Sequence, residues 1–268
     1  MVADVQPMSV DNIKLNLKQK INIKGEDISG CSLLPEGRMV FSDYGTHTVS
    51  VINKDGVDLF QVGDIYDTYD TVYIKDNNSV AVSSGGGGKR CITMIDIESQ
   101  EVMTTITMDT VIYGMAVRGR TIYHCTDSNG LKMLNLSDKS VSDIISSDMS
   151  DRYYVATSGD KLYNTNSDTD TVTCCDLHGT TQWEFKDTSV LQNPLGISVD
   201  NDGNLYVVGF HSHNFVVISP DGQRHRQILS DEDGLEYPRV LDYDSYTNRL
   251  LVVNYAGTAF LFDVTREQ

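Results

Sequence analysis

A repeat of about 40 to 45 residues constrains this chain more than any other feature of its sequence. The clearest copy runs from Asn193 to Gly222, where three short β-rich runs are separated by an Asp-Gly turn and a polar loop. Segments that match its second strand begin at intervals of 41, 42, 40, 43 and 45 residues, at Met39, Val80, Ile122, Leu162, Leu205 and Leu250. Third-strand segments recur in step, from Val49, Ile92, Leu131, Val172, Phe215 and Ala259. A repeat of this length with four strands is typical of a β-propeller blade.

The two ends of the chain complement each other. The first five copies contain an outer strand, but the sixth lacks one because the chain stops at Gln268. The segment Lys14 to Lys24 alternates as a lone strand before the first copy. We therefore predict an all-β, six-bladed β-propeller of four-stranded blades, whose ring is closed by the N-terminal strand completing the last blade. The predicted organisation is a flexible lead-in over residues 1–12 and a single propeller domain over residues 13–268.

Composition restricts the partners. The chain has 21 Lys and Arg residues against 38 Asp and Glu residues, a formal charge of −17, which disfavours RNA and anionic membranes as ligands. No apolar run approaches the roughly 18 residues of a membrane span, and the N-terminus lacks the pattern of a signal peptide. Five scattered cysteines suit reduced thiols. We expect a cytoplasmic protein.

The segment from Asn193 to Gly222 resembles an NHL repeat. The residues that fit the pattern are Pro194, Gly196, Ile197, Val199, Asp200, Gly203, Leu205, Tyr206, Val207, Asn214, Asp221 and Gly222, whereas Phe215 stands where many repeats have Arg. The stretch from Asp233 to Tyr255 resembles the last repeat of tripartite-motif proteins with C-terminal NHL propellers. In that family the propeller is the substrate- or RNA-recognising end of a ubiquitin ligase. The resemblance implies a non-catalytic protein-interaction module, without the zinc modules of the ligase.

In a propeller, the loops between second and third strands and the loops between blades gather on one face. Aromatic and arginine side chains anchor many protein interfaces. The residues predicted to bind a protein partner on this face are Tyr44, Tyr66, Tyr69, Arg90, Tyr113, Arg152, Tyr153, Phe210, His211, Tyr237, Arg239 and Tyr255. The alternative for several of the tyrosines is packing between blades.

Three other functions remain open from the residues alone. RNA binding occurs in some NHL relatives, but here the same loops contain many aspartates. Six-bladed lactonases and esterases hold calcium with carboxylates and amides, a role open to Asp43, Asn164, Asn193 and Asn254, although turns require the same residue types. Propeller lyases use histidine-bound zinc, for which His47, His211 and His213 are the candidates. We expect no metal, no cofactor and no enzyme activity in this chain.

Overall fold

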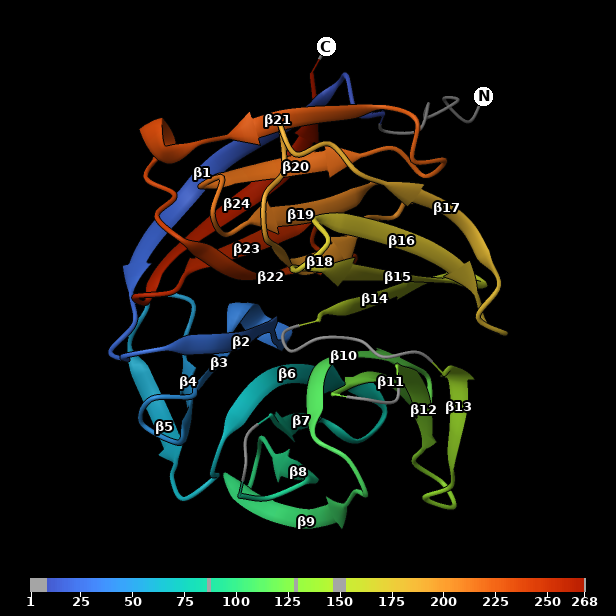
Figure 1. Cartoon of the computed structure of the whole chain (residues 1–268). Helices are drawn as coiled ribbons and strands as arrows, with labels where there is room; N and C mark the ends of the chain where they lie inside the picture. Colours follow the sequence, from blue (N-terminus) through green and yellow to red (C-terminus); the bar gives the residue numbers. More distant parts are fainter. Residues whose placement is uncertain (1–8, 86–87, 128–129, 147–152, 268) are drawn as a thin grey trace, which may run out of the picture.

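The protein is a ring of six four-stranded antiparallel sheets, described by a computed structural model over residues 9–85, 88–127, 130–146 and 153–267. The innermost strands surround the centre of the ring (Figure 1). They are β2 (Ile28–Leu33), β6 (Thr68–Ile74), β10 (Ile112–Arg118), β14 (Val155–Ser158), β18 (Pro194–Val199) and β22 (Pro238–Asp244). The predicted fold class is confirmed.

The second strands begin within one residue of the positions that the repeat predicts. They are β3 (Met39–Asp43), β7 (Ser79–Ser84), β11 (Thr121–Thr126), β15 (Lys161–Asn166), β19 (Leu205–Gly209) and β23 (Arg249–Asn254). The third strands are β4 (Thr48–Ile52), β8 (Cys91–Asp96), β12 (Leu131–Asn135), β16 (Thr171–Asp176), β20 (Asn214–Ile218) and β24 (Thr258–Arg266). The outer strands of blades 1 to 5 are β5 (Asp58–Val62), β9 (Glu101–Thr107), β13 (Val141–Ile145), β17 (Thr181–Phe185) and β21 (His225–Leu229). Three short 3-10 turns also occur in the described residues: Pro35–Gly37, Lys75–Asn77 and Asp231–Asp233.

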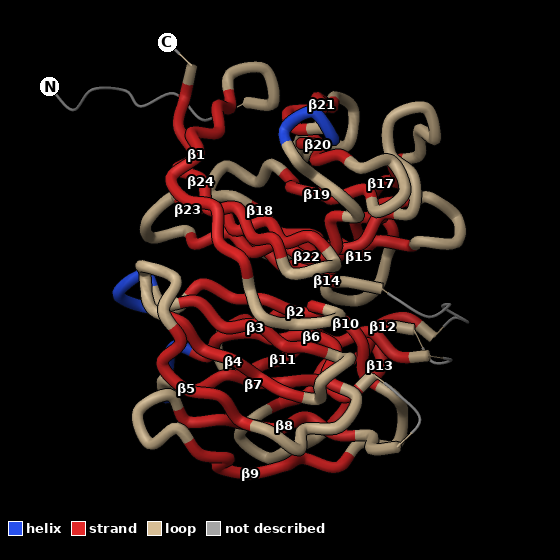
Figure 2. The backbone as a smooth tube through the Cα atoms, turned by 90° about the vertical axis from the view of Figure 1, so that its left-hand side faces the viewer, coloured by secondary structure: helices blue, strands red, loops and turns tan. Residues whose placement is uncertain are grey.

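The N-terminal strand closes the ring. β1 (Ile13–Asn22) pairs antiparallel with β24, from Ile13 opposite Arg266 to Asn22 opposite Thr258, and becomes the outer strand of blade 6 (Figure 2). Residues ahead of this strand also pack on the ring, because the side chain of Val10 is fully buried. The rest of the predicted lead-in, residues 1–8, lies outside the described residues. The first and last parts of the chain therefore share one sheet, as predicted.

The inner strands approach each other most closely where glycine removes the side chain. Gly30, Gly114 and Gly196 occupy this position in blades 1, 3 and 5. A Cβ atom at Gly114 would lie 2.4 Å from the Cα atom of Tyr154, and one at Gly196 would lie 2.8 Å from that of Val240. Glycine in alternate blades thus lets neighbouring blades pack backbone to backbone around the centre.

Apolar residues fill the space between the blades. Phe41, Tyr206 and Phe215 are among the largest fully buried side chains. All five cysteines are free thiols and buried. In the described part of the chain, no helix is long and apolar enough to cross a membrane.

Candidate binding face and central channel

One face of the ring carries the loops between second and third strands and the loops between blades; we call it the loop face. The turns between first and second strands lie on the opposite face, since adjacent strands in each sheet are antiparallel. The predicted site residues that the structure describes belong to the loop face, where they separate into exposed clusters and buried packing residues.

Phe210, Tyr237 and Tyr255 form an exposed cluster at the junction of blades 5 and 6, which we call the aromatic trio. The Phe210 ring centroid lies 5.1 Å from that of Tyr237 and 6.2 Å from that of Tyr255, with ring planes inclined at 47° and 86°. The exposed fraction is 43% for Tyr237 and 38% for Tyr255, whereas Phe210 is half-buried against the core. The N–H of Tyr255 donates to the carbonyl of Tyr237 at 2.9 Å, and exposed His211 lies with its ring 5.4 Å from that of Phe210. Four predicted residues therefore meet at one place.

A second cluster lies at the junction of blades 1 and 2. His47 lies between Tyr44 and Tyr66, with ring centroids 6.3 and 5.3 Å apart respectively. The Nζ atom of Lys89 lies 4.8 Å from the centroid of the Tyr66 ring. Arg90 is exposed nearby in the sequence and donates to the carbonyl of Asp109 at 2.9 Å. This cluster and the aromatic trio belong to different blade junctions.

Four of the predicted residues are buried, with at most 7% of each residue exposed: Tyr69, Tyr113, Tyr153 and Arg239. The guanidinium of Arg239 forms an ion pair with Asp27 and lies 5.6 Å from the ring centroids of both Tyr69 and Tyr255. Burial lowers the pKa of Arg239 to about 10, so it stays protonated at neutral pH. These residues pack inside the ring, which is the alternative that the sequence left open for the tyrosines. The remaining predicted residue, Arg152, lies outside the described residues.

Tyr154 has a central position that the sequence did not single out. Its hydroxyl donates to the carbonyl of Ser29 at 2.7 Å, and its ring lies 5.4 Å from that of Tyr69. Because β14 and β2 belong to blades 4 and 1, this hydrogen bond joins opposite sides of the six-bladed ring. The only sequence signal is the Tyr153-Tyr154 doublet just before an inner strand.

Histidine and aspartate side chains connect neighbouring blades at three of the loops. His47 Nδ1 accepts from the N–H of Asp67 at 3.3 Å, and His213 Nδ1 accepts from the N–H of Tyr237 at 3.2 Å. Asp170 accepts from the N–H of Asn193 at 2.6 Å in the same way. Each of the three acceptor residues lies two positions before the start of a third-strand segment, at Val49, Val172 or Phe215. This shared place in the repeat is a sequence signal for the contact between blades. These side chains serve packing between blades.

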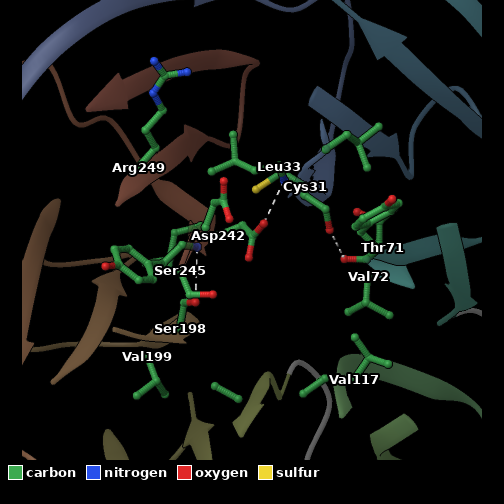
Figure 3. A pocket seen from close by; sticks show the side chains of 18 of the residues that line it. Cys31, Leu33, Thr71, Val72, Val117, Ser198, Val199, Asp242, Ser245 and Arg249 are labelled. Carbon is green, nitrogen blue, oxygen red and sulfur yellow. Dashed lines mark hydrogen bonds between the residues drawn. The ribbon is translucent and has the colours of Figure 1, made fainter. Parts of the chain in front are cut away.

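A cavity of about 910 Å³ occupies the channel and includes the turns on the side opposite the loop face. Figure 3 shows Asp242 and Ser198 on one side of this cavity and Thr71 on another. Asp242 accepts from the N–H of Leu33 at 2.7 Å, and Ser198 accepts from the N–H of Tyr243 at 3.3 Å. Burial raises the pKa of Asp242 to about 6. The polar lining therefore joins adjacent blades as well as facing the cavity.

Asp70 is a second buried carboxylate of the cavity lining. It is 7% exposed and accepts from the N–H groups of Thr71 and Met115, at 2.8 and 2.7 Å. Burial raises its pKa to about 8, against the opposite effect of the two N–H donors. Near neutral pH a substantial fraction of Asp70 therefore carries a proton.

Three of the candidate calcium ligands, Asp43, Asn193 and Asn254, make hydrogen bonds within the fold. Among the residues that the structure describes, no group of three or more His, Cys, Asp or Glu side chains is arranged to hold a metal ion. Asp43 accepts from the N–H groups of Glu26 and Gly45, both at 2.9 Å. Asn193 donates to the carbonyl of Ser167 at 3.1 Å, and Asn254 to that of Gly234 at 3.0 Å.

Comparison with solved structures supports the propeller fold. A structural genomics protein of unknown function from Bacteroides thetaiotaomicron has a TM-score of 0.76 at 14% identity, over 95% of this chain and 76% of that one. Virginiamycin B lyase from Staphylococcus aureus has a TM-score of 0.64 at 15% identity, over 93% of this chain and 88% of the enzyme. An inactive variant of that lyase, solved with quinupristin, has a TM-score of 0.63 at 16% identity, again over 93% and 88% of the two chains. No protein-family profile matches this chain, and no curated protein sequence matches it.

The expectation that this chain is not an enzyme is corrected by these comparisons. Propellers of the same shape include virginiamycin B lyase, which is an enzyme. The expectation came from the NHL resemblance, and a fold shared by recognition modules and enzymes does not exclude catalysis.

Proposed function

We propose that this chain is a protein-recognition propeller that binds its partner on the loop face, with the aromatic trio as the anchor. The observation that supports this proposal is the exposure of Tyr237 and Tyr255 beside half-buried Phe210. Aromatic side chains held rigidly by a scaffold lose little conformational entropy on binding and dominate the energy of many interfaces. The NHL resemblance supports the finer proposal that the partner is the substrate of a tripartite-motif ubiquitin ligase.

Protein is favoured over RNA by the charges on the same face. The loops beside the trio expose Glu26, Glu232, Asp233 and Glu236, and the chain carries a formal charge of −17. Carboxylates repel a phosphate backbone, which nucleic-acid-binding proteins neutralise with lysine and arginine.

The test compares partner capture by variants of two faces. The double substitution Tyr237→Ala with Tyr255→Ala removes the two exposed rings of the trio. Tyr246→Ala is the matched control, because Tyr246 is 76% exposed and lies on the opposite face, where its hydroxyl accepts from Lys75 Nζ at 2.8 Å. We expect quantitative proximity labelling in cells to lose a specific protein set with the double variant and to retain it with the control. Retention of that set by the double variant would refute the proposal.

A further inference from the structure

The aromatic trio leaves part of its ring surface open to solvent. Phe210 lies between Tyr237 and Tyr255, and its ring is inclined to both of theirs, so the three rings do not stack into one closed layer. The Tyr237 and Tyr255 side chains remain substantially open to solvent. Aromatic ring faces attract ammonium and guanidinium groups through their quadrupoles.

The chain segments next to this site carry exposed carboxylates. The carbonyl of Gly234, directly after the acidic turn Asp231–Asp233, accepts from Asn254, the residue before Tyr255. The carbonyl of Tyr255 accepts from the N–H of Ile28 at 3.1 Å, which brings the segment containing exposed Glu26 alongside. Exposed Glu236 directly precedes Tyr237 in the sequence.

The nearby cations are already engaged. Arg239 is buried beneath the trio, where it pairs with Asp27 and packs on one side of Tyr255. Lys20 packs over the ring of Phe260, 5.2 Å from its centroid. Exposed carboxylates next to open aromatic rings thus favour a positively charged group from outside.

We propose that the aromatic trio binds a lysine or arginine side chain from a basic segment of the protein partner. The ring faces supply cation–π attraction, and Glu26, Glu232 and Glu236 supply a negative field that selects a basic segment. This inference rests on the proposed function and specifies the chemistry of the partner.

The experiment uses fluorescein-labelled Gly/Ser peptides with three arginines, three lysines, three glutamines or three glutamates, titrated in fluorescence polarisation. We expect the arginine and lysine peptides to bind, with affinity falling as NaCl rises from about 50 to 500 mM. The formal charge of −17 attracts the cationic peptides to every variant, whichever site they bind. The decisive readout is therefore a comparison at Tyr255: Tyr255→Phe keeps the ring and should bind within about twofold of wild type, whereas Tyr255→Leu should bind about tenfold more weakly.

Two results would overturn this inference. One is equal binding of the arginine and glutamine peptides, and the other is equal affinity of Tyr255→Phe and Tyr255→Leu. Tyr246→Leu on the opposite face controls for loss of an exposed ring elsewhere, and thermal melts check that each variant is folded. The double alanine variant can lose its labelled partner set while the peptides show no preference for Arg or Lys. In that case the proposed function stands and the cation site is refuted.

Discussion

His213 accepts a hydrogen bond through Nδ1 from the backbone N–H of Tyr237, 3.2 Å away, and so joins blade 5 to the start of blade 6. His213 itself has a positive φ of 50°, and Tyr237 one of 49°. His47 and Asp67 repeat this arrangement between blades 1 and 2. His47 and His213, two of the three histidines considered as zinc ligands, thus connect neighbouring blades beside the exposed rings of the loop face.

The contact predicts a difference between two substitutions of His213. Asparagine tolerates a positive φ and retains an acceptor oxygen, so His213→Asn should leave the free energy of unfolding within about 0.5 kcal/mol of wild type. His213→Ala loses the acceptor and should destabilise the fold by about 1 kcal/mol. Urea unfolding measures both, with His211→Ala as the control because His211 is exposed. Equal stability of the asparagine and alanine variants would contradict the role of the hydrogen bond.

Asp70 predicts a loss of stability as the pH rises. Its pKa is about 8 in the folded protein, above the ordinary value of 3.8, so the folded state binds more protons than the unfolded state between these values. The contribution of Asp70 to the free energy of unfolding should therefore fall between pH 4 and pH 8, by at most about 1.4 kcal/mol per pH unit. Asp70→Asn should flatten this slope, although the lost acceptor for Thr71 or Met115 lowers stability by about 1 to 3 kcal/mol. Urea midpoints at pH 5, 6, 7 and 8 provide the measurement. If Asp70→Asn shows the same pH slope as wild type, the pH dependence of stability comes from other groups.

His124 predicts the opposite dependence on pH. The side chain is fully buried, neither ring nitrogen has a hydrogen-bond partner within the described structure, and burial lowers its pKa to about 4. The unfolded state binds more protons below the ordinary value of 6.5, so stability from this group is lost as the pH falls from 6.5 to 4. His124→Leu should be more resistant to acid than wild type while unfolding similarly at pH 8. Thermal melts over pH 4.5 to 8 test this, and an unchanged acid sensitivity would count against it.

Gly114 predicts that a single methyl group disturbs the ring. The Cβ atom of Gly114→Ala would meet the backbone of Tyr153 and Tyr154 at 2.5 and 2.4 Å, where no flexible side chain can move aside. We expect a loss of about 2 to 3 kcal/mol or failure to fold. Gly63→Ala is the matched control, because no atom lies within 4 Å of its added Cβ. The comparison is made by urea unfolding; similar stability of the two variants would show that neighbouring blades separate easily.

The repeat located all six blades because every strand contributes apolar residues at fixed offsets from its turns. The exposure of the loop-face aromatics could not be predicted in the same way. Tyr66 is exposed in the loop before β6, whereas Tyr69, within β6, is buried. The pairing of β6 with β7 shifts register between Thr68 and Thr71, and such a bulge redirects the side chains that alternation would place. Similar shifts occur near the starts of β2, β10, β18 and β22, so the direction of side chains near the channel follows from pairing geometry.

Arg239 and Asp27 provide the last prediction, because their ion pair separates a packing role from a binding role. Arg239→Met leaves the carboxylate of Asp27 without its buried partner and should destabilise the fold by about 3 kcal/mol or more. Adding Asp27→Asn should recover part of this loss, since the unpaired charge is then removed. A double-mutant cycle by urea unfolding gives the coupling energy, and additive effects of the two substitutions would contradict it. Partner capture by the double variant supplies the second readout. We expect capture to persist, because Arg239 is buried and only the rings above it are open to a partner.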